Sequence, residues 1–166
     1  MDFDKLYIEY FQTVYAYLLS ISHDSILAEE LTQETFFKAL KKIESFKDGT
    51  NAKAWLCQIA KNLFYDHSRR AKHNTDFDDA IMEQLVHELS PGIEESLSEK
   101  ELTVRIHKIL HKLDDPYKEV FSLRVFGELA FSDIGVIFDK SDGWARVTYY
   151  RATSKIREEI KNENQL

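Results

Sequence analysis

Apolar residues at helical spacing dominate the beginning of the chain. Tyr7, Phe11, Val14, Leu18 and Ile21 follow one another at steps of four, three, four and three residues. Because this spacing places side chains on one face of an α-helix, the segment predicts an amphipathic first helix.

A second helix is predicted from about Ile26 to Ile43. Asp24 or Ser25 precedes it, and either side chain can accept hydrogen bonds from the free amides of a first turn. The residues expected in its core are Leu27, Leu31, Phe36, Phe37, Leu40 and Ile43. A loop with Asp48 and Gly49 follows, from residue 45 to 51.

A third helix is predicted from about Ala52 to Arg70. Its expected apolar side carries Trp55, Ile59, Leu63 and Phe64. Its other side carries a polar stripe that no core requires, made of Gln58, Asn62, Asp66 and Arg69. Cys57, the single cysteine, falls in the apolar stretch and is expected to be a buried thiol.

The periodic pattern stops after Lys72 and returns near Ser98. The intervening stretch is acidic, contains Ser90, Pro91 and Gly92, and reads as a linker with room for a short helix at 80–89. Ser98 and Glu101 have the spacing of a capping box. An apolar stripe then follows at Leu102, Ile106, Ile109 or Leu110, and Leu113.

The last third of the chain has the outline of a helix-turn-helix. Asp115 is expected to cap a helix whose first residue is Pro116 and which ends at Gly127. A short helix at 131–138, a turn at 139–142 and a long helix from 143 to about 161 follow. A short helix, a tight turn and a longer basic helix are typical of this DNA-binding motif.

Composition agrees with an all-α protein of one domain or two small ones. The chain has 166 residues, 43% of them hydrophobic, and only 5 Gly and 2 Pro, too few for the turns of a β-sandwich. Two bundles of this size would be near the lower limit of independent stability, so a partner would help to hold them.

The distribution of charge changes what the net charge implies. The net charge of −7 argues against DNA as a partner, but residues 74–101 hold nine acids and one base, so the remainder is slightly basic. The bases concentrate in two places: Lys61, Arg69, Arg70 and Lys72, and Arg146, Arg151, Lys155 and Arg157.

The last helix carries the residues best suited to reading DNA. Arg146, Tyr150 and Arg151, with Val147 or Thr148 between turns, fall near its exposed N-terminal part, which enters the major groove in this motif. An arginine fork can contact both acceptors of a guanine or hold a phosphate. Lys155 is expected to contact phosphate or solvent.

Both halves resemble one family, in the right order. The first half resembles region 2 of sigma factors of the extracytoplasmic-function (ECF, group IV) class, in the sigma-70 family, at Asp24 to Leu31, Gln33 to Phe36, Phe46, Trp55, Leu56, Ala60, Asn62, Arg69 and Arg70. The second half resembles region 4 of that family at Leu113 to Tyr117, Glu119, Val120, Phe131, Asp133, Ile134, Gly143, Arg146, Arg151 and Ala152.

The resemblance implies a division into three parts. Residues 1–73 would be the region 2 helical bundle, 74–97 a flexible acidic linker, and 98–166 region 4 with its helix-turn-helix. The family's function would make the chain an alternative sigma factor that directs promoter recognition, DNA melting and transcription initiation and has no active site or cofactor of its own.

The resemblance also assigns roles to individual residues. Core RNA polymerase would be contacted by Glu29, Glu30, Leu31, Gln33, Glu34 and Phe36. The −10 element would be opened and read by Lys47, Asp48, Gly49, Thr50, Asn51, Trp55, Asn62, Arg69 and Arg70. The −35 element would be read by Arg146, Val147, Thr148, Tyr150, Arg151 and Lys155.

The resemblance also implies three partners: core RNA polymerase through its β′ clamp and β flap, promoter DNA, and an anti-sigma factor that is often membrane-anchored. The expected location is the cytoplasm. The chain starts with acids where a signal peptide carries bases, and it has no apolar run of about 18 residues, so no membrane insertion is expected.

Several residues depart from the family pattern. Ala130 stands where a Ser or Thr cap is common, and Ala52 replaces an aromatic residue of the −10 loop. Lys140, Trp144, Ala145 and Val147 are also unusual in the turn and the reading helix. These substitutions leave the fold plausible and the promoter sequence unpredictable.

Three other classes of function compete with a sigma factor. A metalloenzyme could use His107 and His111, whose i, i+4 spacing suits a metal, although neither the glutamate of a zinc-protease helix nor a third ligand accompanies them. A free-standing repressor or response-regulator output module would explain only the second half. A pure interaction module would not need Arg146 and Arg151.

The acidic linker has two interpretations. It can simply confer solubility, or its negative charge can run through the positively charged nucleic-acid channels of the polymerase. In the second case, replacing its acids with Gln should change initiation and promoter escape but not binding to core enzyme, as abortive-transcript patterns would show.

Overall fold

The computed structural model describes residues 2–47, 49, 51–71 and 97–164, and within these ranges all regular structure is helical, as predicted. Asp48, Thr50 and the acidic segment from 74 to 96, with its predicted short helix, lie outside the described residues.

The N-terminal unit consists of three helices. They are α1 (Phe3–Ser22), α2 (Ser25–Lys41) and α3 (Ala52–Ala71), with a short 3₁₀ helix, η1 (Ile43–Ser45), before the loop to α3. The predicted cap of α2 is confirmed, because Asp24 Oδ1 accepts from the amides of Ile26 and Leu27, each at 3.1 Å. The helices α2 and α3 lie within two residues of their predicted bounds, and α1 contains the predicted stripe from Tyr7 to Ile21.

The C-terminal unit consists of four helices, α5 (Leu97–Lys112), α6 (Tyr117–Val125), α7 (Phe131–Ile137) and α8 (Asp142–Asn164). The pair α7 and α8 confirms the predicted helix-turn-helix. Two predicted caps are wrong. Pro116 rather than Asp115 occupies the N-cap of α6 and makes no side-chain cap bond, and Ser98 lies inside the first turn of α5.

The buried face of α3 is rotated relative to its predicted face. Leu56, Cys57, Ala60 and Leu63 are buried, whereas Trp55 and Ile59 are only partly covered. The expectation of a buried Cys57 is confirmed, and burial raises the pKa of its thiol to about 12. The expectation of buried Phe37, Leu40 and Leu102 is wrong, because all three are exposed.

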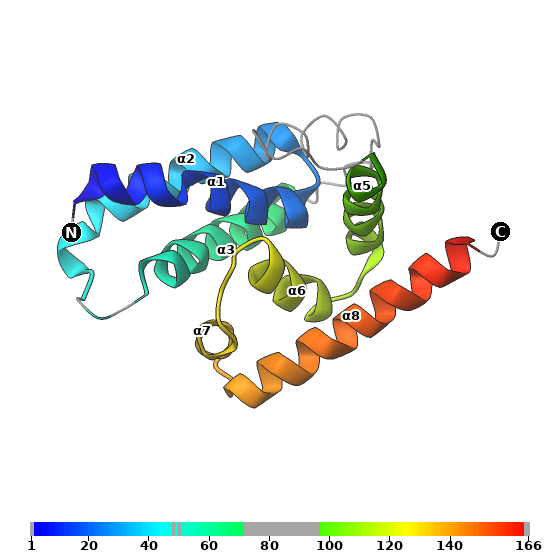
Figure 1. Ribbon diagram of the computed structural model, residues 1–166. Helices are drawn as coiled ribbons and strands as arrows, with labels where there is room; N and C mark the ends of the chain where they lie inside the picture. Colours follow the sequence, from blue (N-terminus) through cyan, green and yellow to red (C-terminus); the bar gives the residue numbers. More distant parts are fainter. Residues whose placement is uncertain (1, 48, 50, 72–96, 165–166) are drawn as a thin grey trace.

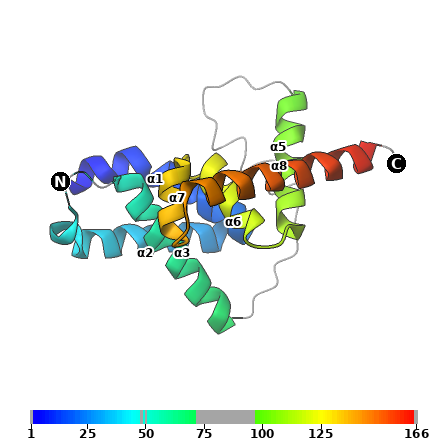
Figure 2. The same cartoon turned by 90° about the horizontal axis from the view of Figure 1, so that it is seen from below.

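The two units share one hydrophobic core. Buried residues of α1, α2 and α3 form a continuous cluster with Val120 and Leu123 of α6, Leu129, Ile134 of α7 and Ala145 of α8. A smaller cluster with Ile109, Phe121 and Ile156 joins α5, α6 and α8. In Figure 1, α6 and α7 lie below α1 and α3, and in Figure 2 α8 crosses this layer. Each unit therefore covers apolar surface of the other.

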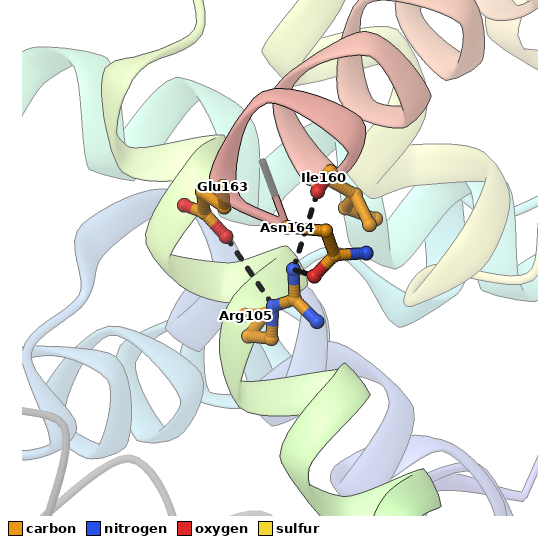
Figure 3. A network of polar contacts seen from close by, with 4 residues as sticks. All are labelled: Arg105, Ile160, Glu163 and Asn164. Atoms are coloured by element: carbon orange, nitrogen blue, oxygen red, sulfur yellow. Dashed lines mark hydrogen bonds and ion pairs between the residues drawn. The ribbon is translucent and has the colours of Figure 1, made fainter. Parts of the chain in front are cut away.

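Arg105 of α5 forms hydrogen bonds with the C-terminal end of α8 (Figure 3). Arg105 donates from Nε to Glu163 Oε2 at 3.3 Å, and from Nη2 to the carbonyl of Ile160 at 3.4 Å and to Asn164 Oδ1 at 3.0 Å. A cation at these last carbonyls also complements the dipole of α8. These bonds fix the long helix relative to the unit that carries it.

Candidate functional site

The outer face of α8 presents the basic and aromatic residues expected to read DNA. Arg146, Val147, Tyr150, Arg151 and Lys155 are all exposed. Tyr150 follows Arg146 by four residues, Arg151 follows Val147 by four, and Lys155 follows Arg151 by four. Neighbours in this set therefore lie beside one another along the exposed half of the helix. An exposed valine and tyrosine between arginines offer apolar contact beside hydrogen-bond donors, which suits base edges and phosphates.

Thr148 corrects one of the expectations for this helix. Its exposed fraction is 5%, because it lies on the side of α8 that packs against the rest of the unit. A side chain so buried supports the helix and cannot contact DNA in this arrangement.

An aromatic ring supports the first arginine of the α8 face. The ring of Phe131, at the start of α7, has the guanidinium of Arg124 at 4.1 Å and that of Arg146 at 5.4 Å from its centroid. Arg124 is itself held by donating to the carbonyl of Leu129 at 2.9 Å. Cations are attracted to the negative face of a ring, so Phe131 restricts where Arg146 can point.

A shallow groove runs beside this face. Its volume is about 530 Å³, and it is lined by Tyr117, Val147, Tyr150, Arg151, Ser154 and Lys155. Lys155 Nζ lies 5.0 Å from the ring centroid of Tyr117, which joins α8 to the start of α6. Two cations and several hydroxyls in one groove fit a nucleic-acid backbone.

The polar stripe predicted on α3 also lines a depression. Lys61, Asn62, Tyr65, Asp66 and Arg69 surround a volume of about 500 Å³. Asn62, Arg69 and Arg70 are exposed, and Asp66 forms an ion pair with Arg69. The structure therefore brings together Asn62 and Arg69, two of the residues expected to contact the −10 element.

The loop before α3 is anchored at its end. Asn51 Oδ1 accepts from the amides of Lys53 and Ala54 at 3.0 and 3.3 Å, which caps α3. Trp55 packs on Phe46, with ring centroids 5.0 Å apart, and so provides an aromatic wall at the base of the loop. Lys47 and Gly49 are exposed.

The face of α2 turned away from α1 and α3 is acidic and apolar. Glu29, Glu30, Gln33 and Glu34 are exposed, as expected for contact residues. Leu31 and Phe36 correct the expectation, since their exposed fractions are 4% and 2% and they belong to the core. Phe37 and Leu40, which the sequence placed in the core, instead stand on this exposed face.

A polar network joins the units, buried at Tyr17 and Glu119 and exposed at Asp115, and sequence reasoning missed it. The Tyr17 hydroxyl donates to Glu119 Oε2 at 2.8 Å, and the Tyr65 hydroxyl donates to Asp115 Oδ2 at 3.4 Å. Burial raises the pKa values of Tyr17, Tyr65 and Glu119, while hydrogen bonds from both tyrosines lower that of Glu119. No sequence signal could reveal it, because the partners are 102 and 50 residues apart.

The histidines do not support a metal site. The ring of His111 packs edge-on against that of His23, with centroids 4.6 Å apart, and His107 packs on Phe126. Among the described residues no group of three or more His, Cys, Asp or Glu could hold a metal ion. In the same part of the chain, none of the helices is both long and apolar enough to cross a bilayer.

Comparisons with known proteins point in one direction. Residues 6–74 match the family described as Sigma-70 region 2. The ECF RNA polymerase sigma factor SigM of Bacillus subtilis (strain 168) is 29% identical over 95% of this chain and 94% of its own length. The ECF RNA polymerase sigma factor EcfG of Rhodopseudomonas palustris (strain TIE-1) is 30% identical over 85% of this chain and 75% of its own.

One solved structure matches both units at once. It is the sigma factor RpoE of Bartonella quintana, in a co-crystal with the anti-sigma factor NepR. The match has a TM-score of 0.77 and 26% identity and covers 96% of this chain and 97% of that one. The similarity therefore extends over both units and the way they are arranged.

Proposed function

Since the chain belongs to the ECF family of RNA polymerase sigma factors, we propose that it binds core RNA polymerase and directs it to promoters, with each unit holding one promoter element. The family makes it an alternative sigma factor that works with polymerase and promoter DNA and is regulated by an anti-sigma factor. The proposed site of action is the cytoplasm, where the polymerase works.

The observation that carries this proposal is the exposed face of α8. In this helix-turn-helix, Arg146 and Arg151 of α8 are exposed, while the opposite side of α8 packs into the core. A helix that enters a major groove has this geometry. In the proposed complex Val147, Tyr150 and Lys155 complete the −35 contact.

We assign two further surfaces to the N-terminal unit, proposed as residues 1–73. The exposed α2 face with Glu29, Glu30, Gln33 and Glu34 contacts the β′ clamp, and exposed Phe37 and Leu40 supply the apolar part of that contact. The depression on α3 and the Trp55 wall hold the unpaired −10 strand, since base stacking needs an aromatic surface beside cations.

The proposal is tested by run-off transcription. Purified chain is mixed with core polymerase and genomic promoter fragments, and discrete transcripts that depend on the chain are expected. A repressor of the same fold would instead bind its site tightly alone and direct no transcription after core is added.

Arg151 tests the −35 contact. Arg151→Ala removes a fork of donors from the exposed face, and we expect about tenfold less transcript at limiting chain concentration. Lys155→Ala should weaken all promoters alike, because a phosphate contact carries no base preference. Transcript levels equal to wild type for Arg151→Ala would contradict the assignment.

Phe131 tests how Arg146 is positioned. Phe131→Leu keeps an apolar side chain but removes the ring face that Arg146 and Arg124 share, and we expect a several-fold loss of transcription. Phe131→Tyr should restore it, because the ring is kept. If Leu and Tyr variants transcribe equally well, the ring does not position Arg146.

A further inference from the structure

The exposed side of α8 has an apolar centre between its two arginines. Val147 is 49% exposed and Tyr150 is 57% exposed. Successive residues of an α-helix are rotated by about 100°, so these two side chains lie about 60° apart around the axis. Arg146 is the next exposed position beyond Tyr150, and Arg151 is the next beyond Val147. The valine and the ring therefore occupy the middle of the face that is proposed to enter the major groove.

The same two residues line one groove. It is the groove of about 530 Å³ beside α8, which Arg151, Ser154 and Lys155 also line. Valine has no polar atom in its side chain, so it can contribute to binding in this groove only by covering apolar surface. The groove therefore offers an apolar contact together with hydrogen-bond donors.

The ring of Tyr150 is held in place by two other rings. Its centroid lies 5.5 Å from that of Tyr149, in an edge-on arrangement, and 6.4 Å from that of Phe131. Tyr149 in turn stacks on Phe121, with centroids 5.9 Å apart, and Phe121 belongs to the cluster that joins α5, α6 and α8. A ring whose position is already restricted loses little conformational entropy when a ligand covers it. Tyr150 is therefore a preorganised part of the exposed face.

The major groove of DNA presents one apolar group that suits such a contact. This group is the C5-methyl group of thymine, which is read by apolar side chains, whereas the other bases are read through donors and acceptors. Arg146 and Arg151 prefer guanine acceptors or phosphates, so they do not compete for it. Val147 is one of the residues that depart from the family pattern, so the contact is a property of this chain.

We infer that Val147 and Tyr150 select a thymine in the −35 element: together they cover its C5-methyl group, at a base pair between those contacted by Arg146 and Arg151. The inference rests on the proposed function, in which α8 enters the major groove, and it adds the base that the middle of the helix selects. The arginines orient the helix and supply affinity, and the apolar pair distinguishes thymine from the other bases.

The experiment uses the full-length chain with core RNA polymerase. Promoter fragments are randomised over one turn of DNA at the −35 element, about 10 base pairs, and the transcribed fragments are sequenced. Each thymine that the selection retains is then replaced singly by deoxyuridine, which removes the C5-methyl group and nothing else. Run-off transcripts from the two templates are compared at limiting chain concentration.

At the selected thymine, deoxyuridine should lower the transcript level by about three- to fivefold, because one methyl group is no longer buried. Val147→Ser should reduce this ratio to about twofold or less, since its part of the apolar contact is gone. Serine and valine have similar helix propensities, so the substitution leaves the stability of α8 almost unchanged. Tyr150→Phe should keep the ratio, because it keeps the ring.

Val136→Ser is the matched control for Val147→Ser. It also removes an exposed valine, which is 78% exposed on α7 and does not line the groove, so it should discriminate between thymine and deoxyuridine as wild type does. Should Val147→Ser not fold, Tyr150→Ser measures the same ratio from the other side chain, and a reduced ratio is again expected.

Three results would overturn the inference while the proposed function stands, since the wild-type chain directs run-off transcription in all of them. The first is a selected −35 element without thymine, and the second is tolerance of deoxyuridine at every thymine. The third is an equal loss with deoxyuridine for wild type and Val147→Ser, which would mean that the methyl group acts through the shape of the DNA. If no promoter is transcribed at all, the proposed function fails and the inference fails with it.

Discussion

Gly135→Ala is expected to lower the free energy of unfolding by about 2 kcal/mol and to impair −35-dependent transcription with it. A Cβ at Gly135 would lie 2.7 Å from the carbonyl oxygen of Lys140 and 2.8 Å from that of Ser141. Both atoms are backbone atoms of the turn into α8, and the Lys140 amide also donates to the Gly135 carbonyl at 2.7 Å. Overpacking of this kind costs up to about 3 kcal/mol, and the better helix propensity of Ala returns about 1 kcal/mol.

Gly143 provides the matched control for this prediction. A Cβ there would meet only Ser141 Oγ at 3.8 Å, which is ordinary contact, so Gly143→Ala should stabilise α8 by about 0.5 to 1 kcal/mol. Denaturant titration of both variants measures the two effects. If both glycines tolerate Ala equally, the α7–α8 turn does not depend on the close approach at Gly135.

Acid should destabilise the folded chain through His23, by about 2 kcal/mol between pH 7.5 and pH 5.0. Burial at the end of α1, reinforced by Lys118 of α6 and by His111 and His107 of α5, lowers the pKa of His23 to about 2. In the unfolded chain a histidine has a pKa of about 6.5, so the unfolded state binds more protons throughout this window. The stabilising contribution of neutral His23 is therefore complete above about pH 6.5 and is lost as the pH falls.

The variant His23→Asn isolates this contribution. His23 has a φ of 54°, in the left-handed region that asparagine tolerates, so the end of α1 can keep its conformation. Unfolding free energies of wild type and His23→Asn, measured by denaturation across this pH range, should converge toward low pH by about 2 kcal/mol, since other titrating groups act on both. Parallel pH profiles would show that His23 is protonated as easily in the folded chain as in the unfolded one.

The position of His23 connects acid stability with the packing of the two units. Its neighbours Lys118, His107 and His111 all belong to the C-terminal unit. A proton on His23 therefore adds positive charge at the junction between the units, where separation would relieve it. The same junction contains the Tyr17 and Glu119 bond, so acid and loss of that bond should both weaken the packing between the units.

Local patterns in the sequence determined most of the helices and much of the candidate surfaces. Helical spacing, the Asp24 cap and the break at Gly127 are properties of neighbouring residues, and α1, α2, α3, α7 and α8 lie where these predict. The periodic pattern also predicted that Arg146, Arg151 and Asn62 are exposed, because they lie on the polar faces of amphipathic helices, and such faces can be recognised from the sequence alone.

Only the tertiary structure decided which way each helix is turned. Successive residues of an α-helix are rotated by 100° about its axis. A predicted buried stripe that is displaced by one residue therefore exchanges core positions with surface positions. This is why Phe37 and Leu40 lie on the α2 surface while Phe36 is buried, and why Thr148 faces inward beside exposed Val147.

The closure of the two units was likewise beyond the reach of the sequence. Tyr17 and Glu119, or Asn51 and Asp133, are separated by 102 and 82 residues, and nothing in their local pattern indicates a partner. What brings them together is apolar surface that neither small unit can bury by itself. The sequence alone determined a helical chain with two basic faces, and the shared core decided how the two units pack against each other.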